Sequence, residues 1–455
     1  MPYTYGTERD EQEMLEAIGI DGVEDLLRQV PAEMRLARPL DLPPAMGELE
    51  LTQHLQSLSQ QNTSAQQAVC FLGGGSYDHF IPAVVDALAS RGEFYTSYTP
   101  YQPEVSQGNL QVMFEYQTLI CQLTGLDVSN ASLYDGGSSV AEAALMSLSI
   151  TRRHGKVIVP STVHPEYRRI LETYLASTDT ELVTVAATNG RVAPADIAAV
   201  IDEGTASVIL QHPNFFGCLE QVEEIAEIAH ANGSLLVMAF DPISLGRLKS
   251  PGELGADIAV AEGQCLGSPM AFGGPYLGIM ACKEEFVRRM PGRIAGETVD
   301  RRGQRCWVLT LQTREQHIRR EKATSNICTN QGLFALRASI YLSVLGPHGL
   351  REVADLCLQK SHFAAELISQ SSRCELAWSD PFFKEFVVRD TRGQVDELLA
   401  EARHDGLLAG VALGRWYPDL EDCFLVSVTE QRTREELERL GSCLSANNNQ
   451  EVCHA

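Results

Sequence analysis

Short apolar runs alternate with amphipathic segments through the middle of the chain. Six of these runs have the length and apolar character of buried strands, and they lie at 157–159, 182–187, 207–211, 235–240, 258–261 and 276–281. Helical patterns lie between them; in the clearest, at 221–230, the apolar residues share one face and Asn232-Gly233 would end the helix. Such alternation predicts an α/β fold with a mostly parallel sheet that helices cover on both faces.

The two ends of the chain have different patterns. Two short helical patterns, at 11–18 and 23–29, precede a proline-rich stretch at 38–44. After Gly332 a long helical pattern is interrupted at 346–349 and resumes to Ser369. Two short strands then alternate with two helices, the strands at 386–389 and 424–428 and the helices at 394–402 and 434–445. The expected domains are an N-terminal helical arm at 1–65, a large α/β domain at 66–332 and a small α+β domain at 333–455.

The composition narrows the functional classes. A net charge of −24 over 455 residues argues against a nucleic-acid or anionic-membrane partner, because both recruit clustered Lys and Arg. No apolar run approaches the ~20 residues that span a bilayer, and the polar N-terminus does not have the pattern of a signal peptide. Twelve cysteines are scattered without any C-x-x-C spacing, so we expect reduced thiols in a cytoplasmic protein and no structural metal site.

One strand end suggests coenzyme chemistry. The apolar run 235–240 ends at Asp241, and in pyridoxal-phosphate enzymes such a carboxylate pairs with the pyridinium nitrogen, while a lysine further along forms the Schiff base. That lysine is expected near 263–266, where the chain has no amine. Of the six lysines, Lys249 lies too close to Asp241, and Lys283 lies past the predicted strand 276–281. The pattern is that of a catalytic scaffold without its nucleophile, which would need a partner.

Three further positions could belong to the same site. The turn Gly136-Gly137-Ser138 precedes a helical pattern, and a helix N-terminus with close backbone approach can hold a phosphate. Asp135 would oppose that phosphate, and an ordinary capped helix start is the alternative. His164 could stack on a pyridine ring or be a hydrogen-bonded structural residue, and Asn214 has the same ambiguity. With Asp241, they follow strands whose carboxyl ends meet at one edge of the predicted sheet.

Two polar segments could meet a ligand. The tyrosine loop, residues 97–108, is aromatic and stiffened by prolines, so presenting it to a ligand costs little entropy; a structural Ω-loop is the alternative. The arginine loop, residues 313–327, is a dense basic stretch in an acidic chain. Its end, Ala323-Thr-Ser-Asn326, suits an anion, although a solvated helix face would give a similar composition.

These segments resemble a known family. Tyr98-Thr-Pro-Tyr-Gln-Pro-Glu-Val-Ser-Gln-Gly108, Gly273-Gly-Pro275 and Arg319-Arg-Glu-Lys-Ala-Thr-Ser-Asn-Ile-Cys328 are similar to segments of glycine dehydrogenase (decarboxylating) subunit 1, the N-terminal half of the glycine cleavage system P-protein. The resemblance covers essentially the whole chain, including the helical arm. It implies an aminotransferase-like architecture of pyridoxal-phosphate fold type I.

The resemblance also implies where the missing lysine lies. P-proteins of this family are one long chain or two related subunits, and only the second half or subunit carries the coenzyme lysine. Alignment on the shared Gly-Gly-Pro puts the lysine position at about Gln264, whose amide cannot form a Schiff base. The residues that the resemblance identifies as remnants of a duplicated coenzyme site are Gly136, Gly137, Ser138, His164, Asn214 and Asp241.

The implied reaction is decarboxylation of glycine on pyridoxal phosphate held by subunit 2. Carbon dioxide leaves, and the remaining aminomethyl group passes to the lipoyl arm of H-protein. The residues expected to face glycine or the lipoyl group are Tyr98, Thr99, Tyr101, Gln102, Glu104 and Gln107, and those expected to face the partner's coenzyme are Arg319, Arg320, Thr324, Ser325 and Asn326. Two alternatives stay open: a self-sufficient pyridoxal-phosphate decarboxylase or aminotransferase with an atypical lysine, and a purely structural pseudo-enzyme subunit.

Overall fold

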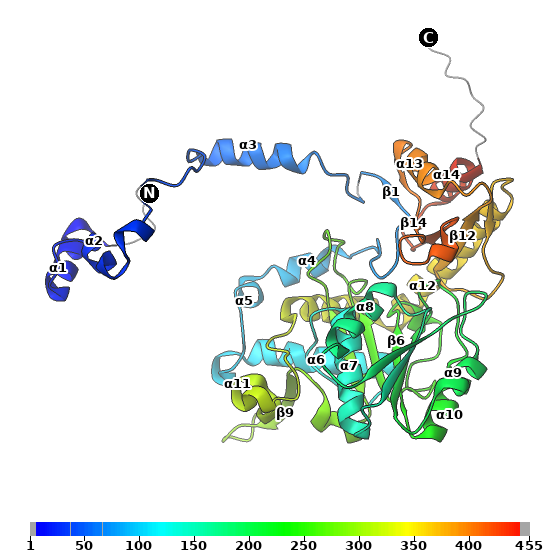
Figure 1. Cartoon of the computed structure of the whole chain (residues 1–455), viewed down its shortest axis with the longest axis horizontal. Coiled ribbons are helices and arrows are strands. Elements are labelled where there is room, and N and C mark those ends of the chain that lie inside the picture. Colours follow the sequence, from blue (N-terminus) through cyan, green and yellow to red (C-terminus); the bar gives the residue numbers. More distant parts are fainter. Residues whose placement is uncertain (1–5, 37, 66, 446–455) are drawn as a thin grey trace, which may run out of the picture. The chain divides into compact units, whose positions relative to one another are not determined.

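The chain forms two compact units, Met1–Thr63 and Ser64–Ala455 (Figure 1). A computed structural model describes residues 6–36, 38–65 and 67–445. The first unit contains the helices α1 (Glu8–Ile18), α2 (Val23–Leu26) and α3 (Glu48–Ser59) and two 3₁₀ turns, η1 (Leu27–Gln29) and η2 (Ala32–Met34). The helices predicted at 11–18 and 23–29 are confirmed, the second as α2 and η1 together. The helix α3 was not predicted from the sequence, because it begins after Gly47 without a side-chain cap from Ser, Thr or Asp.

The second unit is built on a seven-stranded sheet. Its order is β2-β8-β7-β6-β5-β3-β4, with bounds β2 (Val128–Ser129), β3 (Lys156–Pro160), β4 (Glu181–Val185), β5 (Thr205–His212), β6 (Leu235–Phe240), β7 (Ile258–Glu262) and β8 (Gly278–Cys282). The five strands from β7 to β4 are parallel, whereas β8 runs antiparallel to β7 and β2 antiparallel to β8. The six predicted strands and the mostly parallel sheet are confirmed, and the two-residue β2 was missed.

Helices cover both faces of this sheet because its central strands are apolar on both sides. In β6, Leu236 and Met238 belong to one core cluster, whereas Val237 and Ala239 belong to the other. The first cluster includes residues of α6 (Gln107–Thr124), α10 (Val222–Asn232) and α12 (Gly332–Ser369); the second includes residues of α7 (Gly136–Thr151) and α8 (Pro165–Leu175). The predicted helix at 221–230 is α10, which ends at Gly233 in the left-handed conformation, φ 76°.

The remaining elements end at a second, smaller sheet. The long helix α12 is broken at Gly346, φ 58° and ψ −173°, where the interruption was predicted. The antiparallel sheet that follows has the order β11-β12-β15-β14, with bounds β11 (Cys374–Leu376), β12 (Glu385–Asp390), β14 (Val411–Ala412) and β15 (Cys423–Ser427). Two helices, α13 (Val395–His404) and α14 (Arg434–Ser445), pack beside it in one core cluster. The domain boundaries at 65 and 332 stay predictions.

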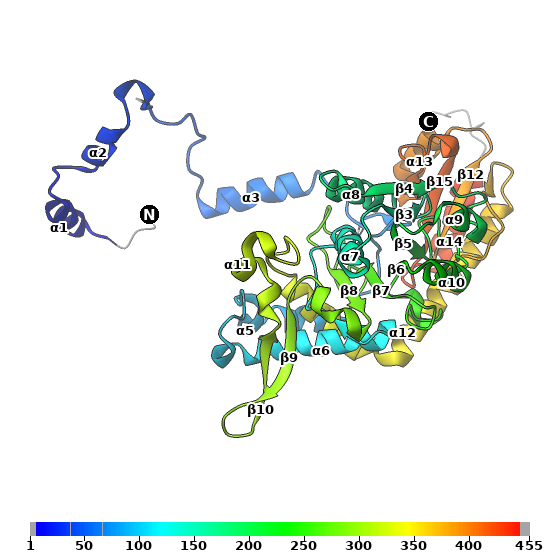
Figure 2. The same ribbon diagram turned by 60° about the horizontal axis from the view of Figure 1, so that its bottom comes forward.

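A two-stranded ribbon projects from the second unit (Figure 2). It consists of β9 (Ile294–Val299) and β10 (Arg305–Thr310), which pair antiparallel. Two glutamines of α6 hold it: Gln117 exchanges bonds of 3.0 and 2.8 Å with the backbone of Ala295, and Gln107 exchanges two bonds of 2.9 Å with that of Trp307. No described helix combines the length and apolar character that a bilayer span requires.

Candidate functional site

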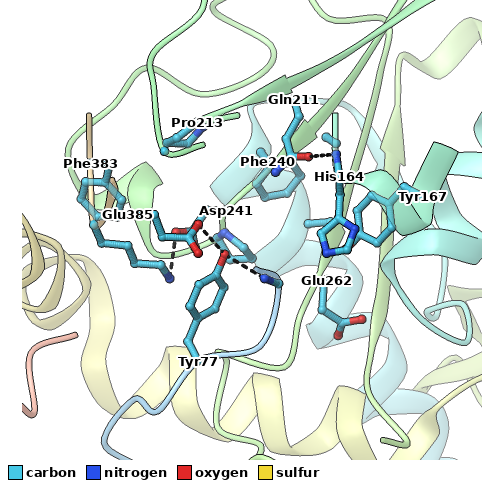
Figure 3. A pocket seen from close by; sticks show the side chains of 16 residues that line it. Tyr77, His164, Tyr167, Gln211, Pro213, Phe240, Asp241, Glu262, Phe383 and Glu385 are labelled. Carbon is cyan, nitrogen blue, oxygen red and sulfur yellow. Dashed lines mark hydrogen bonds and ion pairs between the residues drawn. The ribbon is translucent and has the colours of Figure 1, made fainter. Parts of the chain in front are cut away.

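A small pocket lies where β6, β5 and β3 end, at the edge predicted from the sequence (Figure 3). Tyr77, Asp241 and Glu385 point into one space, and His164 lies beside Tyr167. The cavity has a volume of about 30 Å³, far below the ~300 Å³ and more of pockets that hold a small molecule. The cavity is large enough to hold a water molecule.

Asp241, the carboxylate expected to meet a pyridinium, is paired with this chain's own ammonium group. Its Oδ2 lies 2.8 Å from Nζ of Lys384, which is 1% exposed and sits 3.5 Å from the centre of the Tyr77 ring. Burial lowers the pKa of Lys384, but the Asp241 carboxylate and the buried thiols of Cys265 and Cys357 together raise it more, so the pKa lies above its ordinary value. This cation was not predicted from the sequence, where its only signal is a lone lysine in an apolar run.

The ion pair continues into a chain of buried groups. Nζ of Lys384 donates to Nε2 of His79 at 3.0 Å, and Nδ1 of His79 donates to Glu430 at 2.6 Å. Burial raises the pKa of Glu430, but His79 and the N–H of Phe80 outweigh burial and hold it at about 2. His79, Cys357 and Glu430 present ligand atoms within 4.8 Å of one another, yet both ring nitrogens of His79 already contact Lys384 and Glu430. We therefore interpret this cluster as a hydrogen-bonded chain.

Two of the N–H groups expected to hold a phosphate, those of Gly136 and Ser138, are also used within the chain. Asp135 is the N-cap of α7 and accepts from the N–H of Ser138 at 2.7 Å. Glu262 accepts from the N–H of Gly136 at 3.0 Å, and burial raises the pKa of Glu262 to about 7. A Cβ on Gly137 would lie 2.3 Å from Ile170, so side chains cover this turn. The turn is thus a capped helix start here, the alternative that the sequence left open.

His164 and Asn214 are used in the same way. His164 caps α8, accepting from the N–H of Glu166 at 3.1 Å, and its Nε2 donates to the carbonyl of Gly74 at 2.7 Å. Its ring stacks on Tyr167 with centres 4.5 Å apart, and burial lowers its pKa. The amide nitrogen of Asn214 donates to Gly190 and Glu220, each at 2.8 Å, while its oxygen accepts from the N–H groups of Phe216 and Cys218, each at 3.0 Å.

Gln264, at the implied lysine position, is fully engaged. It is 1% exposed; its oxygen accepts from the N–H of Tyr77 at 2.8 Å, and its nitrogen donates to the carbonyls of Tyr77 at 3.0 Å and Ser268 at 2.8 Å. The chain therefore has no amine at this position. Its Asp241 carboxylate is already paired, and the N–H groups of Gly136 and Ser138 at the start of α7 are already bonded. Pyridoxal phosphate does not fit this pocket.

The tyrosine loop is exposed and ends in the turn η3 (Pro103–Val105). Tyr98 is 87% exposed and Val105 80%, and Tyr101, Gln102 and Glu104 are also exposed. Thr99 is half-buried. Gln107 is half-buried as well, and its amide is engaged with Pro103 and Trp307, so it holds β10.

The arginine loop contains η6 (Gln312–Arg314), α11 (Gln316–Arg319) and η7 (Arg320–Lys322). Of its predicted site residues, Ser325 is half-buried and the exposed ones are Arg319, Arg320, Thr324 and Asn326. Both loops lie on one side of the second unit, since α11 lies near α5 (Gly92–Tyr95) in both views (Figures 1 and 2). The centres of the Tyr101 and His317 rings are 5.3 Å apart, so the two loops are in contact.

The sheet order and the pocket at the strand ends define a class of protein. A sphingosine-1-phosphate lyase from Burkholderia pseudomallei has the same fold, with a TM-score of 0.66 at 14% identity, covering 91% of this chain and 93% of the lyase. The class is pyridoxal-phosphate fold type I. In this chain, its own side chains close the pocket.

Within this class, the chain belongs to the glycine cleavage system P-protein family, whose profile matches residues 2–444. It is 51% identical to a probable glycine dehydrogenase (decarboxylating) subunit 1 of Desulforamulus reducens, over 98% of this chain and 100% of that protein. A solved structure of glycine decarboxylase (P-protein) of the glycine cleavage system, in inhibitor-bound form, superposes with a TM-score of 0.91 at 44% identity, covering 98% of this chain and 99% of that one.

Proposed function

We propose that this chain is the subunit of glycine decarboxylase that carries no coenzyme lysine. It would act in a hetero-oligomer with a homologous second subunit, because its relatives are named subunit 1. The observation that carries the proposal is Gln264: a buried amide with every group engaged stands where the nucleophile is expected. A self-sufficient pyridoxal-phosphate enzyme is disfavoured for the same reason.

The second subunit would hold pyridoxal phosphate, which supplies the electron sink for loss of carbon dioxide from glycine. The remaining aminomethyl group would pass to the lipoyl arm of H-protein. This chain would contribute the tyrosine and arginine loops. Tyr98, Tyr101 and Glu104 are exposed and can orient glycine or the lipoyl arm through ring contacts and hydrogen bonds.

The arginine loop would meet the partner's coenzyme phosphate. Arg319 and Arg320 supply positive charge, while Thr324, Ser325 and Asn326 supply hydroxyl and amide donors close by. Exposure supports this assignment, because four of these five side chains face solvent in the chain by itself. Thr99, Gln102 and Gln107 belong to the same loop as Tyr98, Tyr101 and Glu104, and they too would face glycine or the lipoyl group.

The test has two parts. Absorbance spectra of the isolated chain with added pyridoxal phosphate should show no protein-bound coenzyme, and spectra of the complex with the second subunit should show it. A borohydride-reducible adduct on any of the six lysines of this chain would contradict the proposal.

The second part replaces one residue in each loop. Glu104→Ala and Asn326→Ala, in complexes verified as intact, should each lower kcat for glycine decarboxylation by ~10-fold or more, as expected for groups that act in the transition state. Gln122→Ala, an exposed change on α6, is the control. If both complexes keep wild-type kcat and KM, the purely structural pseudo-enzyme replaces this proposal.

A further inference from the structure

A buried arginine lies between the two loops. Arg293 directly precedes β9 and is 4% exposed. Its Nη1 donates to the side chain of Asn330 at 2.8 Å and reaches Thr329 at 3.3 Å. Its Nη2 donates to the carbonyl of Cys328 at 3.0 Å and to the hydroxyl of Tyr101 at 3.4 Å. One guanidinium group therefore contacts the tyrosine loop and the segment that directly follows the arginine loop, residues 328–330.

Four more contacts complete this arrangement. Nε of Arg293 lies 4.0 Å from a carboxylate oxygen of Glu315, which is 9% exposed and lies in the arginine loop. Nδ1 of His317 lies 3.5 Å from the same carboxylate oxygen, and the His317 ring lies against Tyr101. The guanidinium carbon of Arg293 is 5.4 Å from the centre of the Tyr101 ring. We call these four residues, Tyr101, Arg293, Glu315 and His317, the loop junction.

We propose that Arg293 is a positioning residue that fixes the tyrosine loop and the arginine loop relative to one another. The inference rests on the proposed function, in which both loops complete the partner's site. Only arginine suits the position, because its planar fork sends donors in several directions while keeping its charge. A lysine would keep the charge as a single point and could not bridge Tyr101, Cys328 and Asn330 at once.

The hydrogen bonds within each loop cannot fix the loops relative to one another. The tyrosine loop is turned by local bonds such as Val105 N–H to Gln102, at 3.2 Å, and the arginine loop by bonds such as Glu315 N–H to Gln312, at 3.0 Å. Such bonds shape each loop separately. At the loop junction, Arg293 contacts Tyr101 of the tyrosine loop on one side and Glu315 of the arginine loop on the other.

Loss of the Arg293 contacts should change the relative position of the two loops more than it changes the stability of the fold. Reacting groups lose rate steeply when they are displaced by about 1 Å, so two loops that drift apart should lower kcat. The positions of the loops do not depend on coenzyme binding in this chain, whose own pocket is closed. The substitution should therefore lower turnover through the positions of the two loops, and not through the closed pocket of this chain.

The experiment compares Arg293→Lys with Arg302→Lys, a matched control at the exposed tip of the β9–β10 ribbon. Peptide-level hydrogen exchange is measured on the full-length chain and on its complex with the second subunit. Arg293→Lys should speed exchange ~10-fold or more in both 97–107 and 313–328 and leave β5 and β6 unchanged. In the intact complex it should lower kcat ~10-fold at near-constant KM for glycine. Arg302→Lys should change neither.

Each result decides the matter. Exchange that rises in one loop or in neither overturns the inference, whatever happens to kcat. Faster exchange throughout β5 and β6 also overturns it, because Arg293 would then be a general stabilising residue. Faster exchange in both loops with unchanged kcat supports the loop junction and instead contradicts the proposed function. Should Arg293→Lys fold poorly, Glu315→Gln removes the charge that faces Arg293, and exchange in the two loops should again rise together.

Discussion

Gln264 is a structural residue in this chain, hydrogen-bonded to the backbone of Tyr77 and Ser268. Gln264→Lys would leave the N–H and carbonyl of Tyr77 without these partners and bring a second ammonium near Lys384. We expect it to lose about 3 kcal/mol of unfolding free energy in urea titrations and to form no borohydride-reducible coenzyme adduct, because Asp241 and the N–H groups of α7 remain occupied. Gln122→Lys, on the exposed face of α6, is the control. A reducible adduct at the introduced lysine would show the pocket to be open.

Because Glu142 is buried, we expect the free energy of unfolding to depend on pH. It lies in α7, is 2% exposed, has an oxygen that no hydrogen bond reaches among the described residues, and contacts Ser325 of the arginine loop. Burial raises its pKa from 4.5 to about 7, so between these values the folded chain binds a proton that the unfolded chain has lost. This contribution to stability is present below pH 4.5 and is lost as pH rises through about 7.

Glu142→Gln removes that titration. Unfolding free energies at pH 5.5 and pH 8 should therefore differ less in the variant than in the wild type, by roughly 2 kcal/mol. The exposed Glu227→Gln on α10 serves as the control and should leave the difference unchanged. An identical pH dependence in the wild type and in Glu142→Gln would rule out this glutamate as the titrating group.

For individual residues, the sequence could predict that the polar residues after the strands lie together, but not which residues they contact. His164, Asn214 and Asp241 do lie at the carboxyl ends of β3, β5 and β6, because parallel strands share that edge. The partner of Asp241 lies 143 residues further on, since 384 − 241 = 143. No local pattern pairs residues across such a distance. Arg293 was not predicted as a site residue for the same reason, because its partner Tyr101 lies 192 residues away in the sequence.

Among the elements, the β9–β10 ribbon depends on two side chains of α6. Gln117 is 7% exposed and exchanges two hydrogen bonds with Ala295. Gln117→Leu keeps the volume and deletes both bonds, so it should cost about 2 kcal/mol and speed hydrogen exchange in 294–310 before the large sheet responds. Gln122→Leu, one exposed position of the same helix, should not. Unchanged exchange in the ribbon would mean that strand pairing alone holds it.

The elements that the sequence could predict are those with a strong periodic or continuous apolar signal. β6 is apolar throughout because it is buried on both faces, and α10 has one apolar face and a glycine stop. The ribbon was missed because its residues are mixed in polarity, as in Gly296-Glu-Thr-Val299. β11 and β14 are three and two residues long, too short for any period to show.

For the whole molecule, the exposed apolar side chains of the tyrosine loop indicate a partner surface. Tyr98 and Val105 are among the most exposed large hydrophobic residues of the second unit. We expect this chain and its homologous second subunit to elute as one complex after co-expression, through an interface of ~2,000 Å² or more. Size-exclusion chromatography with light scattering measures this directly. Two independent peaks at micromolar concentration would rule out an obligate assembly.

The ion pair between Asp241 and Lys384 links the end of β6 to the residue that precedes β12, and so joins the large sheet to the small one. A ligand that does not bind the folded chain cannot stabilise it, however abundant the ligand is. This subunit should therefore reach its final shape whether a cell is rich in vitamin B6 or starved of it. Coenzyme supply would then determine how many complexes are active, while the number of folded subunits available for assembly stays the same.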